Sequence, residues 1–402
     1  MKTKLRALTC TFFLPWICIA QMKLIGFQTL PGQGTSNIIK WEADAPGNVS
    51  TVATDVTSII IANSTFNAAN GDFIAKVNVG NASGILEFNA LNNLLEFNSA
   101  TIVTNGSSEC DMQTGNVYSY DNNSNNQKVL KKYNPATNED LTIGTFNFPA
   151  DAQFYPDSSC FDSNLGIYYF VMSDSGGLKL VSVPVNSNEF SYTETLITGL
   201  PILGNIGLEF SNDSDTIFAT FTTITTDVNN GQGYLFHVGK ISSQGGLESL
   251  MEIPEVISYQ FYNRTFDQLS NSMIFIGNDE TGTRLFVYDT DTNQYTAKLL
   301  PQGYLYEIES DNYDYAVERY GSLSTTDINL NQLVIVNQNL QTMQFSNQLL
   351  GKNFELFSVT GAKVVSGKVP ANLSFDYSRF PSGVYIIKLD DGGRQISGKL
   401  KL

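Results

Sequence analysis

The chain has one histidine in 402 residues, His237, and this scarcity excludes whole classes of active site. Ser-His-Asp or Cys-His catalysis, and histidine-rich metal sites, would all have to use this side chain. A Gly-x-Ser-x-Gly elbow, a phosphate-binding Gly-Lys-Ser/Thr loop and paired Cys-x-x-Cys ligands are also missing from the sequence. His237 lies in a strand-like run with no nucleophile motif nearby, so we expect an ordinary strand residue.

Basic residues are scarce as well, with 23 Lys and Arg against 39 Asp and Glu and a net charge of −16. Three of these basic residues lie in the first six positions, and without them the 39 acids face 20 bases, a charge of about −19. Such a surface repels nucleic acid and anionic lipid. We therefore expect no nucleic-acid partner.

Long hydrophobic runs are limited to the N-terminus. Lys2, Lys4 and Arg6 precede an apolar stretch, 7–19, and a small residue, Ala20, which is the layout of a secretory signal peptide cleaved after Ala20. A membrane anchor would need ~20 apolar residues, and this run is shorter and is interrupted. No later segment is long and apolar enough, so the mature chain is predicted to have no transmembrane span.

Cysteine is also rare. Two of the four cysteines lie in residues 1–20 and would be removed with the signal peptide. The remaining pair is Cys110 and Cys160. An oxidising compartment permits a disulfide between them, and two unlinked buried thiols are the alternative.

A sequence repeat of about fifty residues fills the region from 22 to 316. Each of the first five copies has an aromatic residue or Cys followed by Asp, Asn or Ser, then three residues, a Gly, Asn or Asp, and a strand, and a fainter sixth copy begins with Glu309 instead. The second positions of the six copies are Asn67, Asp111, Asp162, Ser211, Asp267 and, more faintly, Ser310. Each copy has room for four short antiparallel strands, and repeated units of this size are typical of a β-propeller.

We therefore predict an all-β fold in which residues 21–322 form a six-bladed β-propeller, with seven blades as the main alternative. The sixth copy has room for few strands, whereas strand-like pieces precede the first copy. Joining them in one blade removes a free sheet edge. A long open β-sandwich array is the remaining alternative.

A second unit is expected at 323–402, comprising a polar linker and a small β-sandwich. Its motifs are Val359-Thr360-Gly361-Ala362-Lys363, then Phe380-Pro381-Ser382-Gly383-Val384-Tyr385-Ile386-Ile387-Lys388, and the closing Lys399-Leu400. These segments resemble the type A C-terminal sorting domain of proteins exported through the type IX (Por) secretion system of Gram-negative bacteria. The Asn-Pro turn with which that family often begins is missing, because residues 337–340 contain no proline.

The resemblance implies a destination and partners. The chain would cross the outer membrane through the type IX machinery, lose its tail to a cell-surface peptidase, and be secreted or attached to the outer cell surface. The sorting residues that the resemblance identifies are Gly361, Pro381, Ser382, Gly383, Tyr385, Lys388 and Lys399. They would serve recognition, and none is a catalytic candidate.

Carboxylates are the remaining candidates for chemistry. Asp111, Asp162 and Asp267 share one repeat position, and Glu109 and Glu209 lie two residues before it. If these groups face the propeller axis, they could bind a cation such as calcium. The alternative is that each Asp begins a tight turn by accepting hydrogen bonds from nearby backbone amides.

These observations leave three hypotheses open. The first is a secreted or surface-displayed propeller that binds a protein or glycan ligand and has no catalytic residues or required cofactor. The second is a calcium-dependent propeller hydrolase or lactonase, and the third is an extracellular adhesion or structural component.

Overall fold

A computed structural model describes most of the chain after the predicted signal segment. The described residues are 22–57, 59–79, 82–98, 107–123, 125–187, 189–202, 206–224, 233–300, 303–321, 334–337, 341–358, 362–381, 383–390 and 395–401. The predicted cleavage after Ala20 and the predicted boundary at 322–323 therefore fall outside them.

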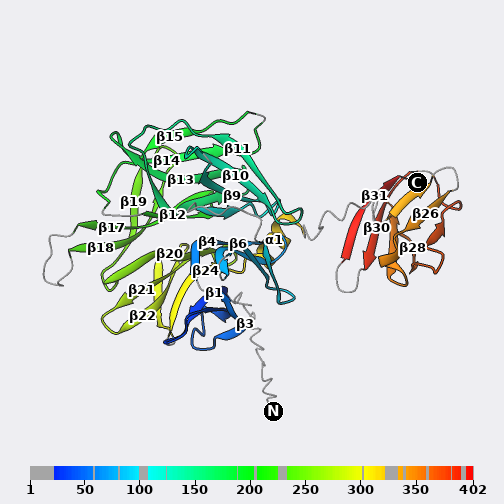
Figure 1. The fold of residues 1–402 in the computed structure, drawn as a ribbon, viewed down its shortest axis with the longest axis horizontal. Helices are drawn as coiled ribbons and strands as arrows, with labels where there is room; N and C mark the ends of the chain where they lie inside the picture. The colour runs from blue at the N-terminus through cyan, green and yellow to red at the C-terminus, as the bar shows by residue number, and fades with distance from the viewer. Residues whose placement is uncertain are drawn as a thin grey trace, which may run out of the picture.

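Six four-stranded antiparallel sheets, here called blades 1 to 6, are formed by the described residues between 23 and 310 and surround a common axis (Figure 1). Blade 1 is β4(Ile59–Asn67), β5(Asp72–Val79), β6(Ala82–Asn89) and β7(Leu94–Asn98). Blade 2 is β8(Ser108–Cys110), β9(Val117–Asn122), β10(Lys128–Asn134) and β11(Glu139–Thr145). Blade 3 is β12(Gln153–Asp162), β13(Ile167–Asp174), β14(Gly177–Pro184) and β15(Thr193–Leu196). Blade 4 is β16(Ile206–Ser211), β17(Thr216–Ile224), β18(Tyr234–Ile241) and β19(Leu247–Ile253).

Blade 5 is β20(Ser258–Asp267), β21(Ser272–Asp279), β22(Gly282–Asp289) and β23(Gln294–Leu299). Blade 6 joins the two ends of this region, with the order β24(Tyr304–Ser310), β1(Lys23–Thr29), β2(Ser36–Glu42) and β3(Ser50–Thr57). β1 pairs with β24 in antiparallel register, for example Leu24 with Ser310. The expected blade built from both ends of the repeat region is thus present.

The repeated motif forms the turn between the first and second strands of a blade. Its sixth residue adopts a left-handed conformation in each of the first five copies, with φ from 48° to 81°. Glycine, asparagine and aspartate tolerate that conformation better than other residues do. This explains the residues found there, which are Gly71, Gly115, Gly166, Asp215 and Asn271.

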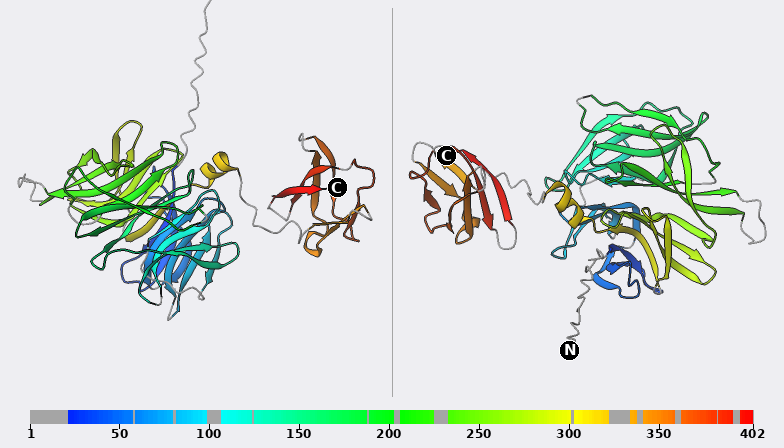
Figure 2. Two further views of the ribbon diagram at one scale, coloured as in Figure 1. Left: turned by 90° about the horizontal axis from the view of Figure 1, so that it is seen from above. Right: turned by 180° about the vertical axis from the view of Figure 1, so that it is seen from behind.

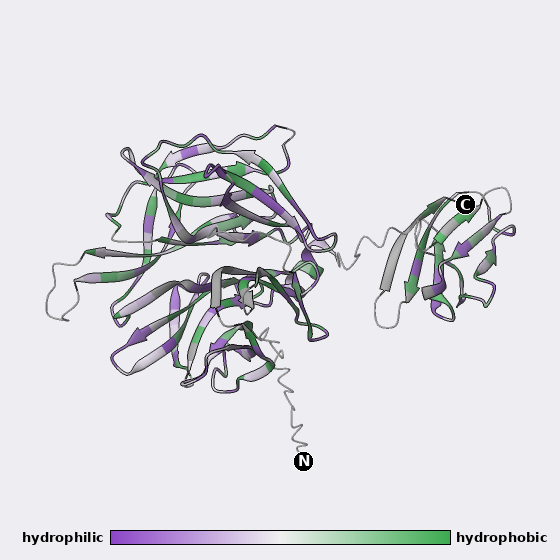
Figure 3. Cartoon of the chain, in the orientation of Figure 1, coloured by the Kyte–Doolittle hydropathy of each residue, from purple (hydrophilic) through white to green (hydrophobic). Residues whose placement is uncertain are grey.

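The second strand of a blade is buried on both faces, because each blade packs between two neighbours. In β21, the side chains of Ile274 and Phe275, which point to opposite faces, are both fully buried. Such strands are hydrophobic along their length rather than alternating, as the colouring in Figure 3 shows for many central strands.

Aromatic pairs join successive blades at one repeat position. Tyr118 of blade 2 stacks on Phe161 of blade 3 with ring centroids 5.1 Å apart. The same pairing recurs between Phe218 of blade 4 and Phe266 of blade 5 at 5.4 Å. The interface between blades 2 and 3 therefore resembles the interface between blades 4 and 5.

After β24 the chain forms the helix α1(Tyr313–Tyr320), which lies against one face of the propeller (Figure 2). The next described strands belong to a smaller unit of two sheets. One sheet contains β25(Val334–Asn337), β26(Thr342–Phe345) and β29(Ser374–Asp376). The other has the order β28(Lys363–Lys368), β27(Asn353–Ser358), β30(Val384–Asp390) and β31(Gln395–Lys401), and a 3-10 turn, η2(Asn347–Leu349), lies between β26 and β27.

The two small sheets bury a core of their own, which includes Met343, Phe354, Leu356 and Ile387. The predicted fold class, an all-β propeller followed by a small C-terminal β-sandwich, is confirmed.

Candidate functional site in the propeller axis

The axis of the propeller is lined by the first strand of each blade. These strands, β4, β8, β12, β16, β20 and β24, contact one another in sequence around a closed ring. β12 also contacts β4 and β20 across the ring, so the space that the strands enclose is narrow. Side chains on these strands are therefore the candidates for a central site.

Three glutamates from alternate blades occupy equivalent positions on this ring. Glu109 lies on β8 of blade 2, Glu209 on β16 of blade 4 and Glu309 on β24 of blade 6. Successive members are 100 residues apart in the sequence. The propeller interior thus repeats every two blades, with three carboxyl groups around the axis.

Each of these carboxyl groups has a partner on the next blade. The carboxylate of blade 2 accepts a hydrogen bond from Ser159 Oγ (2.6 Å), and the carboxylate of blade 6 accepts one from Ser64 Oγ (2.7 Å). The carboxylate of blade 4 lies 3.4 Å from Arg264 Nε. Ser64, Ser159 and Arg264 stand at the same repeat position of blades 1, 3 and 5, so the pairing follows the two-blade repeat.

Arg264 also binds the backbone at the centre of the ring, and its side chain is only 5% exposed. Its Nη2 donates to the carbonyl oxygens of Leu208 (3.1 Å) and Asp157, and its Nε donates to Leu208 O (3.2 Å). One guanidinium therefore holds blades 3, 4 and 5 together. Charged hydrogen bonds of this kind are among the strongest in proteins.

Two further acids, Asp157 and Glu307, lie on the ring in strained backbone. Their φ angles are 60° and 53°, a region that residues other than glycine rarely occupy. Both lie where the register between the inner strand and its neighbour shifts. Glu307 Oε2 accepts a hydrogen bond from the amide of Ser64 (2.7 Å), and the Glu307 amide donates to Asn263 Oδ1 (3.0 Å).

Burial raises the pKa of all five acids. It raises the pKa of Glu209 to about 7, that of Glu307 to about 8 and that of Asp157 to about 6, while Arg264 acts in the opposite direction on each. Burial and then the charge of Glu209 raise the pKa values of Glu109 and Glu309 well above their usual range. Burial therefore favours the protonated form of Glu109, Glu307 and Glu309 near neutral pH.

The three aspartates singled out by the repeat lie in separate turns at one end of the axis. Asp111 Oδ1 accepts from the Gln113 amide (3.0 Å), and Asp162 Oδ1 accepts from two amides in its own turn (both 2.9 Å). Asp267 accepts from the Ser270 amide (2.9 Å) and from Ser310 Oγ (2.6 Å). These contacts match the turn role described above.

No group of three or more His, Cys, Asp or Glu side chains arranged to hold a metal ion occurs in the part of the chain that the structure describes. The repeat pattern draws attention to Glu109 and Glu209 but does not reveal the five axial acids as a set. The glutamates recur every two repeats, and a search for features shared by every repeat does not find them. The sixth copy also fits the sequence repeat one residue out of register, because Asn312 and not Asp311 has the role that Gln268 has in blade 5.

A chain of side-chain to backbone hydrogen bonds closes the turn end of the axis. The amide of Met112 donates to Ser163 Oγ (2.9 Å), and the Ser163 amide donates to Asn212 Oδ1 (2.9 Å). The series continues from the Asn212 amide to Gln268 Oε1 and from the Gln268 amide to Asn312 Oδ1, both at 2.9 Å. Each blade is thereby linked to the next from blade 2 to blade 6.

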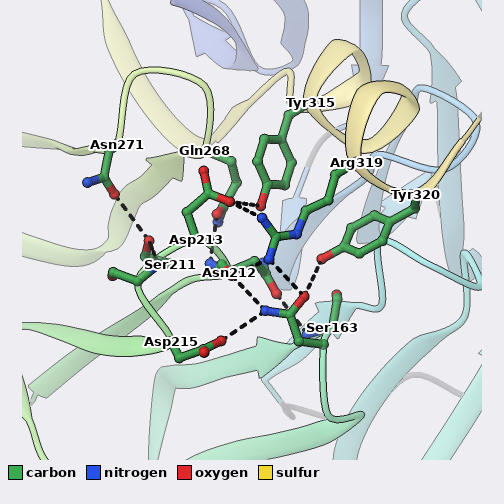
Figure 4. A network of polar contacts seen from close by, with 12 residues as sticks. Ser163, Ser211, Asn212, Asp213, Asp215, Gln268, Asn271, Tyr315, Arg319 and Tyr320 are labelled. Atoms are coloured by element: carbon green, nitrogen blue, oxygen red, sulfur yellow. Dashed lines mark hydrogen bonds and ion pairs between the residues drawn. The ribbon is translucent and has the colours of Figure 1, made fainter.

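Helix α1 covers this end, as Figure 4 shows. Tyr315 donates its hydroxyl hydrogen to Asp213 Oδ1 (3.0 Å), and Arg319 forms an ion pair with the same carboxylate. Arg319 Nη2 also donates to the carbonyl of Asn212 (2.9 Å), and the Tyr320 hydroxyl donates to Asn164 Oδ1 (3.0 Å). The helix therefore spans from blade 6 to blades 3 and 4 across the end of the axis.

His237 lies on β18, away from the inner strands, and is 3% exposed. Its ring contacts Thr223 Oγ1 (2.7 Å) and Ser249 Oγ (2.9 Å) and stacks on Phe221. Burial lowers the pKa of His237. The imidazole is thus part of the packing between strands of blade 4.

Cys110 and Cys160 are buried free thiols. The structure therefore has the unlinked pair and not the disulfide that the sequence also permitted. The two residues occupy adjacent, not equivalent, repeat positions, and successive residues of a strand point to opposite faces. Cys110 packs with Ile74 and Ile85 of blade 1, whereas Cys160 packs with Leu208 and other residues of blade 4. The thiols therefore lie in different blade interfaces.

The sorting residues that the structure describes lie on, or just before, the strands of one sheet of the sandwich. Gly361 and Ser382 lie outside the described residues. Pro381 and Gly383 immediately precede β30, and the buried Tyr385 donates its hydroxyl hydrogen to Pro381 O (2.7 Å). This bond ties the strand to the turn that precedes it.

Lys388 and Lys399 lie on the paired strands β30 and β31 of that sheet. Lys388 Nζ lies 5.3 Å from the centroid of the Phe357 ring, and Lys363 Nζ lies 5.7 Å from it. A shallow pocket of about 440 Å³ beside them is lined by residues that include Glu355, Lys368 and Lys388. The outer face of this sheet is therefore basic, in contrast to the acidic chain as a whole.

Comparison with known proteins identifies the fold and no family. No protein-family model matches the chain, and no curated protein matches it. Among solved structures, TolB from Acinetobacter baumannii superimposes with a TM-score of 0.53 at 11% identity, over 72% of this chain and 66% of that one. Pseudomonas aeruginosa periplasmic gluconolactonase gives a TM-score of 0.45 at 10% identity, over 72% of this chain and 98% of that one.

The likeness to TolB shows a β-propeller and does not extend to activity, because the identity is low and the match spans less than two thirds of the TolB chain. Within the described ranges, no helix has the length and the apolar composition needed to cross a membrane.

Proposed function

We propose that this chain is a secreted or surface-displayed bacterial protein, exported by the type IX system through its C-terminal sandwich, with a non-catalytic propeller that binds a protein or glycan. The observation that carries the export proposal is the separate core of residues 334–400. All the buried residues of this core come from this segment, which is what we expect of a sandwich that folds and is recognised as a separate unit.

The basic outer face of the same sandwich supports recognition by a partner. Lys363 and Lys388 flank Phe357, and Glu355 is paired with Lys363. The two ammonium groups make cation–π contacts with the ring, and aromatic residues are enriched at protein interfaces.

A binding role for the propeller is supported by the state of its polar centre. The axial carboxyl groups contact Ser64, Ser159 and Arg264 instead of pointing at a nucleophile, and His237 is committed to packing in blade 4. A general acid or base must be able to reach a substrate proton. The axial carboxyl groups and His237, which are the candidates for catalysis in the sequence, therefore make structural contacts.

Export is tested by expressing the full chain, and the chain truncated after residue 333, in a Gram-negative host that has the type IX machinery. We expect the full chain in the medium or on the cell surface, without its tail, and the truncated chain inside the cell. The matched control is the same host without the translocon. Mass spectrometry of both termini decides, and an intact C-terminus retained in the cell with the translocon present would contradict the proposal.

The binding role is tested separately, on the mature full chain, by a glycan and surface-protein screen together with calorimetric calcium titration. A saturable ligand with no product formed supports it. Heat from calcium binding at millimolar concentration, accompanied by turnover of a lactone, would instead support the hydrolase hypothesis.

A further inference from the structure

The axis of the propeller carries an excess of acidic groups that its hydrogen bonds do not balance. Five carboxyl groups approach it, and the basic side chain that interacts with all of them is Arg264. If all five were ionised, one guanidinium would leave four negative charges in a narrow, largely buried space. Buried charge of one sign is costly unless protons or counter-charges remove it.

Every strand packed around the axis contributes to this balance. The ionisable and charged groups that face the acids are Glu109 of β8, Asp157 and Cys160 of β12, Tyr168 of β13, Glu209 of β16, Tyr259 and Arg264 of β20, and Glu307 and Glu309 of β24. β4 contributes the uncharged Ser64. The thiol and the two phenols are neutral near pH 7, because burial raises the pKa of each.

The contacts of two glutamates fit the neutral acid as well as the carboxylate. One oxygen of Glu109 accepts from Ser159, and one oxygen of Glu309 accepts from Ser64. A protonated carboxyl group keeps this acceptor and gains a donor. Neither glutamate forms an ion pair with Arg264 within the described residues, whereas Glu209 does.

We propose that the propeller axis is a proton-dependent lock, in which Glu109 and Glu309 are neutral carboxylic acids that each hold one blade to the next and whose ionisation loosens the ring of inner strands. The proposal is independent of the export route and of the ligand, since it concerns the assembly of the six blades.

The sign of the effect follows from proton linkage. Between the ordinary pKa of glutamate, 4.5, and the raised values in the folded chain, the folded state binds more protons than the unfolded state. Stability therefore falls as pH rises from about 5 through 7 and 8, and it levels off once the folded-state groups have ionised. Most proteins with paired carboxylates instead lose stability toward acid.

Trp41 provides a selective measurement. Of the two tryptophans in the chain, one lies in residues 1–20, and Trp41 is buried in the propeller between blades 5 and 6. Thermal unfolding of the mature full chain, followed by tryptophan fluorescence, thus reports the propeller and not the sandwich. We expect the Tm to fall by on the order of 5 °C or more between pH 5 and pH 9.

The test variants are Glu109→Gln and Glu309→Gln, in which the amide keeps the acceptor and has no ionisable proton. We expect each to raise the Tm at pH 9 and to reduce its dependence on pH, with little change at pH 5. The matched control is Glu139→Gln, which removes an equal charge from an exposed site and should leave the dependence unchanged. In infrared spectra at pH 7, the protonated carboxylic acid band should be weaker in both test variants than in the control.

Three results would overturn the proposal. One is a wild-type Tm that stays level or increases from pH 5 to pH 9, and another is a Gln variant that is less stable than wild type at pH 9. The third is full recovery of the pH 9 Tm on adding millimolar calcium, which would show that a cation rather than protons neutralises the ring.

Discussion

The propeller and the C-terminal sandwich differ in the sign of their charge. Residues 21–333 contain 35 acids and 12 bases, a net charge of −23, whereas residues 334–402 contain 4 acids and 8 bases, a net charge of +4. The propeller therefore repels anionic partners, and the sandwich attracts them. The overall charge of −16 conceals this contrast, and it would have misled any inference about what the last seventy residues bind.

The two units differ equally in their interiors. Among the described residues, the polar and charged residues that are buried as a whole all lie in the propeller, whereas in the sandwich only single polar atoms, such as Thr342 Oγ1, are buried. The sandwich is stabilised by a single apolar core, whereas the propeller combines apolar blade interfaces with a polar axis. Apolar cores tolerate changes of pH, while a polar axis depends on the ionisation of its groups. The comparison predicts two units that respond differently to mutation and to solvent.

Removing one large side chain from each core gives the largest expected effect. Phe275→Ala should destabilise the propeller by about 3–5 kcal/mol, and Leu356→Ala should destabilise the sandwich by about 2–5 kcal/mol, because both side chains are fully buried. The fluorescence of Trp41 reports the propeller. We expect Phe275→Ala to lower its unfolding midpoint and Leu356→Ala to leave it unchanged. A shift of equal size in both variants would show that the units unfold together.

Replacing the axial arginine tests the polar interior. Arg264→Met should cost about 3 kcal/mol, because Glu209 and two buried carbonyl groups lose their partner. The loss of the guanidinium also raises the pKa of Glu209, which burial has already raised to about 7. The difference from wild type should therefore grow from pH 5 to pH 8. Urea unfolding followed at both pH values measures it, and a difference that shrinks with pH would refute this account of the axis.

The fold was largely predictable from the sequence because its signals are local. The turn motif requires a left-handed sixth residue, and Gly71, Gly115 and Gly166 stand where that conformation occurs. The strands between the turns could be predicted from their residue patterns, and the pairing of β1 with β24 could be predicted from the incomplete sixth repeat. Each of these features depends on a few neighbouring residues or on the need to cover a sheet edge.

The axial site was not predictable in the same way, because it joins residues about 50, 100 and 200 positions apart. Nothing near Arg264 in the sequence indicates that its guanidinium reaches Asp157 on another blade. The bulges that turn Asp157 and Glu307 toward the axis depend on tertiary packing. The free thiols differ in this respect, because the adjacent repeat positions of Cys110 and Cys160 and the alternation of faces along a strand can both be read from the sequence.

Glycines with the same backbone conformation allow a matched pair in the two units. Gly166 has φ of 67° and a Cβ there would meet the side chain of Asn186, whereas Gly351 has φ of 73° with open space around it. Gly351→Ala should cost about 1 kcal/mol from backbone strain alone. Gly166→Ala should cost about 2 kcal/mol, because the Asn186 amide must also move. Near-UV circular dichroism melts can follow the sandwich variant, and equal costs would show that the turn in blade 3 adapts freely.

The smallest effect is expected where helix α1 meets the propeller. Arg319→Ala removes a hydrogen bond to the Asn212 carbonyl and an ion pair with Asp213 whose side chains are 35% and 50% exposed, so the substitution should cost about 1 kcal/mol. Salt screens such pairs, and the difference from wild type should shrink at 1 M sodium chloride. Tyr315→Phe is the matched control, because it removes a neutral donor to the same carboxylate and its effect should not depend on salt. If Arg319→Ala lowered the midpoint of Trp41 as much as Arg264→Met does, then closure of the axis by α1, rather than the buried ring of acids, would dominate the stability of the propeller.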